Sequence, residues 1–216
     1  MGLRGGGWRE PKFADMTLAS RRITVEEYLA RERQAAFKSE YFQGKIYAMS
    51  GANESHNLIV ANIVGELRSQ FKGRPCRVLP SDMRVKVSPA GLYTYPDVLA
   101  WRGDARYEDE KKDTLLNPGL IVEVLSRRTE SYDRGEKFAH YRQLESMTDY
   151  VLVSQVRFRV EHFSRLSEGR WLLTEHSEIN EVLELVNLKC QLPLSEIYEN
   201  VLLESPRLRA RRRKPK

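Results

Sequence analysis

The sequence predicts an α/β domain in which a mixed β-sheet is flanked by helices. Two continuous apolar runs, at 119–126 and 150–154, have the length and composition of strands buried on both faces. Apolar residues recur at helical spacing in 55–71, and 130–144 also reads as a helix. Strand and helix signals that follow one another along the chain are typical of this class.

Length and composition favour one globular domain. The chain has 216 residues, of which 41% are hydrophobic, enough to bury a full core. We expect a disordered leader at 1–16, a single domain at 17–204 and a basic disordered tail at 205–216. The formal charge is +6, and part of it lies in the tail. Such a tail either binds the phosphates of a nucleic acid or is a solvated end of the chain.

The sequence carries no membrane or export signal. No apolar run approaches the roughly 20 residues of a membrane span, and the N-terminus lacks an apolar signal region. Cys76 and Cys190 share no metal-type spacing, so we expect free thiols in a reducing cytosol. The predicted location is cytoplasmic.

The first elements have clear boundary signals. A short helix at 24–31 would begin at Thr24 as N-cap, with Glu27 as its capping-box partner. Residues 38–49 read as two strands joined at Gln43-Gly44. The helix at 55–71 is followed by glycine and proline, which stop helices.

The remaining elements follow from shorter patterns. We expect strands at 77–87 and 95–101, then a loop or short helix at 104–113. A hairpin is expected from 157–166 and 170–175, and mixed structure closes the domain at 179–203.

Two strand carboxylates suggest a metal site. Glu123 lies in the middle of the apolar run at 119–126, where an ionised acid needs a compensating cation, either a metal or a basic side chain. Adjacent strands would bring Asp97 within reach of the same ion. Mg²⁺ is commonly held by one or two carboxylates, and it can polarise a phosphodiester and activate a water. Each acid, like Glu40, could instead be a solvated strand-end carboxylate.

A basic group follows on the next predicted helix. Asp133, Lys137 and Tyr141 fall at i, i+4 and i+8, so they share one side of the helix. The long stem of Lys137 could carry its ammonium back toward Glu123, where it would position water and offset charge on a phosphate. The alternative is a surface Asp133–Lys137 pair worth about 0.2–0.5 kcal/mol.

Several residues are candidates for the edge of the site or for nucleic-acid contact. His56 could donate to a phosphate or carry a proton, or it could only cap and pack its helix. Asp82 could line the cleft or belong to a turn. Arg84 and Lys86 could touch a nucleic-acid backbone or form the solvent side of a strand. Tyr141 is placed at the same edge.

A set of short motifs matches a known family: Glu40–Gly44, Ser55–Asn57, Pro96-Asp97, Ile121–Ser126 around Glu123, and Asp133–Lys137 followed by Tyr141. In this combination they closely resemble the Uma2 (DUF820) family of endonucleases, within the PD-(D/E)XK nuclease superfamily. The resemblance covers roughly residues 20–203. It implies a restriction-endonuclease-like core.

The resemblance also implies roles. Asp97 and Glu123 would bind Mg²⁺ or Mn²⁺, and Glu40 would hold a metal-bound water or a second ion. The superfamily's usual lysine lies two residues after the second acid, where this chain has Leu125. Lys137 is the residue that matches this family's replacement.

We therefore expect a metal-dependent endonuclease acting on DNA, and a homodimer would let such a domain embrace a duplex. Leu125 and the modest charge of the domain support a rival: a catalytically weak or inactive module that binds nucleic acid or protein. A third reading is a phosphatase or other small-molecule hydrolase that uses the same acids.

Overall fold

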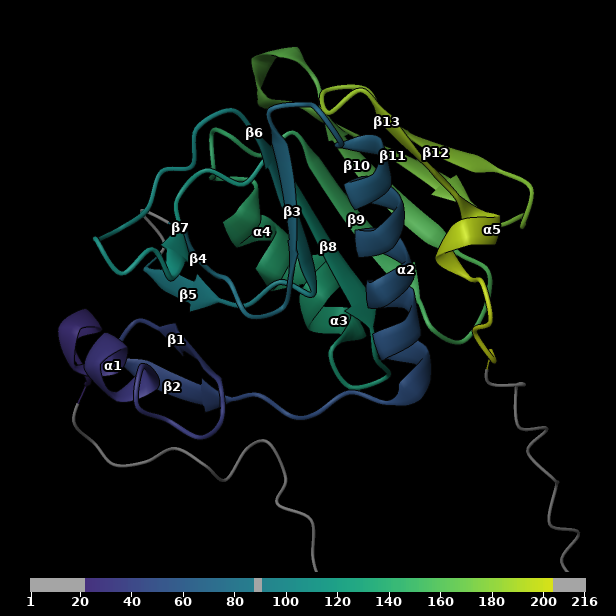
Figure 1. Ribbon diagram of the computed structural model, residues 1–216. Coiled ribbons are helices and arrows are strands. Elements are labelled where there is room, and N and C mark those ends of the chain that lie inside the picture. The colour runs from purple at the N-terminus through teal and green to yellow at the C-terminus, as the bar shows by residue number, and fades with distance from the viewer. Residues whose placement is uncertain (1–21, 88–90, 204–216) are drawn as a thin grey trace, which may run out of the picture.

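The structure is a computed structural model that describes residues 22–87 and 91–203 (Figure 1). The predicted leader at 1–16 and the basic tail at 205–216 lie outside the described residues. Within the described ranges, no helix is long and apolar enough to cross a membrane.

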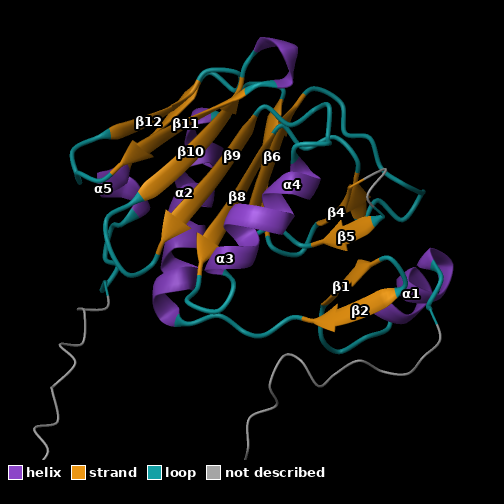
Figure 2. Cartoon of the chain, turned by 180° about the vertical axis from the view of Figure 1, so that it is seen from behind, coloured by secondary structure: helices purple, strands orange, loops and turns teal. Residues whose placement is uncertain are grey.

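A six-stranded mixed sheet forms the centre of the molecule (Figure 2). Its central pair, β8 and β9, is parallel, and every other neighbouring pair is antiparallel. In spatial order the strands are β11 (Trp171–His176), β10 (Val160–Arg165), β9 (Asp149–Ser154), β8 (Leu120–Leu125), β6 (Val98–Arg102) and β3 (Cys76–Pro80).

A second sheet of five short strands lies beside the first. Its order is β2 (Lys45–Ala48), β1 (Ser39–Phe42), β5 (Leu92–Thr94), β4 (Arg84–Val87) and β7 (Thr114–Leu115). A separate hairpin pairs β12 (Val182–Leu185) with β13 (Cys190–Pro193).

Helices cover both faces of the six-stranded sheet. The long α2 (Glu54–Gln70) lies on one face, and a helical run lies on the other (Figures 1 and 2). That run comprises α3 (Glu130–Tyr132), the π-helix η1 (Asp133–Lys137) and α4 (Phe138–Tyr141). The remaining helices are α1 (Val25–Glu32), the 3₁₀ turn η2 (Ser167–Gly169) and α5 (Leu194–Ile197).

Successive side chains along a strand point to opposite faces of the sheet. They therefore divide the core between the layer at α2 and the layer at the helical run. Val122 and Val124 pack with α2 in one apolar cluster. Ile121 and Leu125 point to the opposite face and pack with Tyr141 and its neighbours in another cluster. Glu123 has the same parity as Ile121, so its carboxylate faces the helical run.

Several predicted elements are confirmed. Thr24 caps α1 in a complete capping box, and α2, β8 and β9 lie within one or two residues of their expected bounds. Gln43 and Gly44 have φ of 47° and 88°, the left-handed conformations that a two-residue hairpin turn requires. The later hairpin forms as β10 and β11.

Two strand predictions are wrong in detail. The single strand expected at 77–87 is two strands, β3 and β4, which belong to different sheets. The strand expected at 95–101 begins only at Val98, because Pro96 cannot donate to a sheet ladder. The expected helix at 130–144 ends at Tyr141 and contains a π turn.

Candidate active site

Three carboxylates surround one buried amine. Lys137 Nζ lies 2.9 Å from Glu123 Oε1, 3.4 Å from Glu40 Oε1 and 3.7 Å from Asp133 Oδ1. The side chains of Lys137, Glu123 and Asp133 are 5–7% exposed, whereas that of Glu40 is 15% exposed. The six-stranded sheet, the five-stranded sheet and the helical run therefore each contribute a charged group to one cluster.

The π turn presents two of its four charged side chains to the sheet. Asp133 and Lys137 are its first and last residues, and both are buried. The hydroxyl of Tyr150 on β9 donates to the Asp133 carbonyl at 3.0 Å, which ties the turn to the sheet. Phe138 stacks on the Tyr150 ring at 5.1 Å and anchors the start of α4. Short π segments are frequent at functional sites, and a surface Asp133–Lys137 pair is ruled out by this burial.

Two hydroxyls complete the cluster. The Tyr141 hydroxyl donates to Glu123 Oε1 at 2.8 Å. Thr94 Oγ1 donates to Glu40 Oε1 and lies 3.4 Å from the Tyr141 hydroxyl. Sequence reasoning missed Thr94, and its only signal was its position three residues before Asp97.

Asp97 lies next to Glu123. The antiparallel register pairs Val98 with Val122, so its continuation places Asp97 opposite Glu123. Asp97 Oδ2 accepts the backbone N–H of Val124 at 2.7 Å. Its other oxygen is 3.1 Å from His56 Nε2. His56 thus reaches the cluster from the first turn of α2.

Burial and neighbouring charges shift the pKa values of the acids in the site. Burial raises the pKa of Glu123 well above its usual range, Lys137 opposes this rise, and the charges of Asp97 and Asp133 add to it. Burial also raises the pKa of Asp133. Because Glu123 responds to the charge of Asp97, the two carboxylates share one electrostatic environment.

Lys137 is held as a cation. Burial acts to lower its pKa, but the carboxylates of Glu123 and Glu40 outweigh burial, and the pKa is raised well above its ordinary value. Burial together with the negative charge of Glu123 raises the pKa of Tyr141. At neutral pH the amine is therefore an ammonium ion and the phenol is neutral.

The donor set at Asp97 and Glu123 suits a hard cation in part. Among the described residues, no three His, Cys, Asp or Glu side chains are grouped to hold a metal ion. Mg²⁺ needs only one or two carboxylates when waters and phosphate oxygens complete its shell. The site has more carboxylates than ammonium groups, and hydrogen bonds hold Asp97 and Glu123 in place. Asp97 and Glu123 therefore fit as the protein's share of such a shell.

Some predicted residues take other positions. Arg84 was expected on a solvent or nucleic-acid face, but its guanidinium is buried and contacts Tyr95, Thr114 and Asp113. That placement is wrong because Tyr95, Thr114 and the partly buried Asp113 hold the guanidinium inside the protein. Asp82 lies in a turn with its side chain 90% exposed and pairs with Lys38.

Two further positions refine the prediction. Tyr141 was expected at the edge of the site, but it is fully buried inside the cluster. Leu125, at the position of the superfamily's usual lysine, is buried in the apolar cluster around Tyr141. The amine therefore comes from the helical run instead of the strand.

Known proteins are similar to this chain in sequence. The model of the Uma2 family, described as "Putative restriction endonuclease", matches residues 25–195. Two uncharacterized proteins of Synechocystis sp. are similar. Protein sll1609 is 35% identical over 81% of this chain and 99% of its own length, and slr1290 is 33% identical over 83% and 93%.

A solved structure has the same architecture. The crystal structure of "a putative nuclease belonging to DUF820" from Anabaena variabilis aligns with a TM-score of 0.67 and 18% identity, over 83% of this chain and 99% of that one. This likeness confirms the restriction-endonuclease-like α/β fold. The match along 25–195, most of the chain, leads to one conclusion: the chain belongs to the Uma2 family.

Proposed function

We propose that the protein is an endonuclease that requires a divalent metal ion and hydrolyses phosphodiester bonds in DNA. The observation that carries the proposal is the cluster of Glu40 and Glu123 around the Lys137 ammonium, with Asp97 opposite Glu123. Buried acids with raised pKa values beside a fixed cation are typical of catalytic sites. The family description, a restriction endonuclease, supports DNA as the substrate.

Asp97 and Glu123 would hold Mg²⁺ or Mn²⁺. A divalent ion bound there would polarise the phosphodiester and favour ionisation of a water. The protein's own part is to keep both carboxylates in place. Val124 and His56 fix Asp97, and Tyr141 fixes Glu123.

Lys137 would act by its charge. As an ammonium ion it cannot accept a proton from water, so a role as general base is excluded at neutral pH. It would instead offset negative charge that develops on the phosphate. Glu40 is more exposed than the other acids of the cluster, which suits a carboxylate that orients the attacking water.

His56 would serve at the leaving-group or phosphate side. Its ring contacts Asp97 at 3.1 Å and is 17% exposed, so the ring can both touch solvent and hold the acid. A homodimer that embraces a duplex, and action in the cytoplasm, belong to the same proposal.

The test is cleavage of supercoiled and linear DNA with added Mg²⁺, Mn²⁺ or EDTA. We expect cleavage only with metal, and loss of cleavage in Asp97→Asn, Glu123→Gln and Lys137→Met. Matched controls are Asp104→Asn and Glu136→Gln, which change exposed acids near the same elements. Metal-independent cleavage, or full activity in Glu123→Gln, would refute the proposal.

One observation favours a second candidate, a module that binds nucleic acid without cutting it. Glu123 and Lys137 are almost fully buried and already neutralise each other at 2.9 Å. Calorimetric titration with Mn²⁺ separates the two candidates. Metal binding that is lost in both Asp97→Ala and Glu123→Ala supports the enzyme, whereas DNA binding with no metal binding supports the module.

A further inference from the structure

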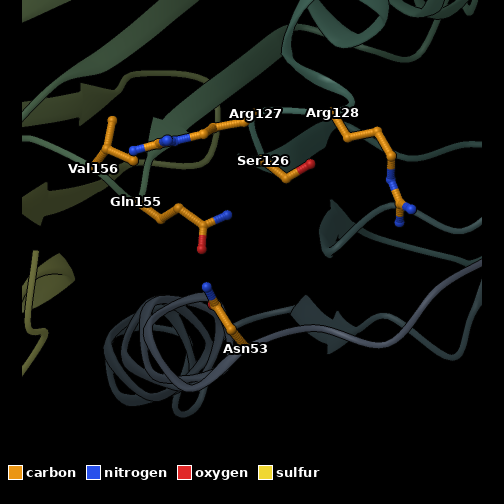
Figure 3. Close-up of a pocket in the computed structure, with 6 residues that line it drawn as sticks. All are labelled: Asn53, Ser126, Arg127, Arg128, Gln155 and Val156. Carbon is orange, nitrogen blue, oxygen red and sulfur yellow. The ribbon is translucent and has the colours of Figure 1, made fainter. Parts of the chain in front are cut away.

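A pocket of about 300 Å³ lies at the carboxyl end of β8, the strand that carries Glu123 (Figure 3). It is formed where the parallel strands β8 and β9 end and where α2 begins. Its lining residues are Asn53, Ser126, Arg127, Arg128, Gln155 and Val156. Ligands of open α/β sheets commonly bind beyond the carboxyl ends of such strands.

Gln155 brings a buried, unpaired acceptor to this pocket. The residue is 7% exposed, and its Nε2 donates to the Leu125 carbonyl at 2.9 Å. That bond fixes the orientation of the amide. Oε1 is buried and has no hydrogen-bond partner among the described residues. Leaving such an atom unpaired is destabilising, so a ligand that supplies a donor would be stabilised there.

Asn53 faces Gln155 across the pocket. Figure 3 shows the two carboxamides directed toward each other. Asn53 Oδ1 accepts the His56 N–H at 2.9 Å as the N-cap of α2, which leaves its amide nitrogen on the Gln155 side. The pocket therefore presents one acceptor and one donor to a ligand between them.

The rim of the pocket favours negative charge. Arg127 and Arg128 are exposed and line it, and Arg128 also contacts the Ser50 hydroxyl. The N-terminus of the 17-residue α2 adds a partial positive charge. Glu54 in the same helical turn is exposed and is not among the lining residues.

These features together select a ligand class. An anion that carries no proton would leave Gln155 Oε1 unpaired, and a metal cation would be disfavoured by the two guanidinium groups that line the pocket. A nucleotide satisfies both, because a base carries N–H donors and acceptors around its ring and its phosphate suits the guanidinium groups. We propose that the pocket binds a nucleobase of the strand held at the carboxylates, with Gln155 accepting from the base and Asn53 donating to it.

This inference rests on the proposed function, because it assumes a polynucleotide at the neighbouring acids. The connection is short along the chain: Ser126 follows Glu123 by three residues, and His56, which contacts Asp97, follows Asn53 by three. A strand with its scissile phosphate at Asp97 would place the adjacent nucleotide near the pocket.

The test measures binding without catalysis. Calorimetry in EDTA would compare deoxyadenosine 5′-monophosphate with 2-deoxyribose 5-phosphate, which lacks the base. We expect the wild type to bind the nucleotide roughly threefold to tenfold more tightly, the range that one or two hydrogen bonds supply. Gln155→Met and Asn53→Ser should each reduce that preference, and serine keeps the N-cap acceptor of α2.

Gln143→Met is the matched control, because Gln143 is exposed and also donates to a backbone carbonyl, at 3.2 Å. The pocket assignment is overturned by no measurable nucleotide binding, by equal binding of the two probes, or by a base preference that persists in both pocket variants. Cleavage of DNA with any of these results would overturn the pocket alone. A base preference without DNA cleavage would overturn the nuclease and leave the pocket.

Discussion

Two charge clusters in this molecule are built on opposite principles. The site cluster comprises Glu40, Glu123, Asp133 and Lys137, with three acids around one ammonium. The second, which we call the anchor cluster, ties α1 to the five-stranded sheet and comprises Glu32, Arg33, Arg84, Tyr95 and Asp113.

In the anchor cluster the charges are matched. Asp113 Oδ2 accepts a hydrogen bond from Arg33 Nε at 2.8 Å and lies 2.7 Å from Arg84 Nη2. The hydrogen bonds from Arg33 lead the effects that hold the pKa of Asp113 well below its usual range, despite partial burial. Tyr95 donates to Glu32 at 2.9 Å and accepts from Arg84 at 2.8 Å.

In the site cluster the acids lack enough cations, and burial raises the pKa of Glu123. The difference teaches how to separate a structural acid from a functional one in this fold. An acid whose pKa is lowered by its partners stabilises the protein, whereas an acid whose pKa is raised is retained at the expense of stability.

The largest effect is expected from breaking the anchor cluster. Arg84→Met should lower the free energy of unfolding by about 3–5 kcal/mol, because it leaves the partly buried Asp113 without one of its two cations. Urea denaturation measures the change, and Arg106→Met, at an exposed arginine, is the control. A loss below about 1 kcal/mol would mean that Arg33 alone suffices.

Breaking the site cluster should affect activity instead. Glu123→Gln should lower the rate of DNA cleavage by roughly 10²–10³-fold. The unfolding free energy at neutral pH should not fall, because a carboxylate with a raised pKa is removed while Glu40 and Asp133 still face the Lys137 ammonium. Cleavage rates and urea midpoints of the same preparation check both parts, and a large loss of stability with activity retained would reverse the comparison.

The two clusters should respond to pH with opposite sign. Asp113 has a lowered folded pKa, so its stabilisation is present above about 3.9, its unfolded value, and is lost as the pH falls further. Glu123 has a raised folded pKa, so the protein loses stability as the pH rises above about 4.3 toward that raised value.

Unfolding measured from acid to neutral pH checks this contrast. As the pH rises, the free energy of unfolding of the wild type should increase relative to that of Asp113→Asn. It should decrease relative to that of Glu123→Gln. The same sign for both variants would contradict the assignment of the two clusters.

The smallest effect is expected at Asp133. Its charge raises the pKa of Glu123, so Asp133→Asn should lower that pKa. The acid limb of the plot of DNA cleavage rate against pH should then move to lower pH, by less than about one unit. A shift to higher pH would show that the main role of Asp133 is to position Lys137.

Much of the fold could be predicted from local patterns in the sequence. The apolar run around Glu123 specified β8, and helical spacing specified α2, because burial on two faces or on one stripe leaves its own periodicity. The same spacing brought Lys137 to the correct side of its helix. The strand patterns placed Asp97 beside Glu123, and the motif match added a role for Glu40.

What the sequence did not predict depends on contacts between distant residues. The assignment of β3 and β4 to different sheets leaves no local pattern. The burial of Arg84 depends on Asp113, which is 29 residues away, and the contact of Thr94 with Glu40 spans two strands. The π turn at 133–137 is built from ordinary helix-compatible residues, so only packing against β9 reveals it.

The transfer of the amine from strand to helix has a consequence for how such proteins are found. A search pattern that demands lysine two places beyond the second acid would discard this chain, since Leu125 stands there. A pattern that tolerates a gap of fourteen positions, from Glu123 to Lys137, would retain it. Relatives that have moved the same charge elsewhere are better sought by asking which remote side chain can reach the acid than by fixed intervals along the polypeptide.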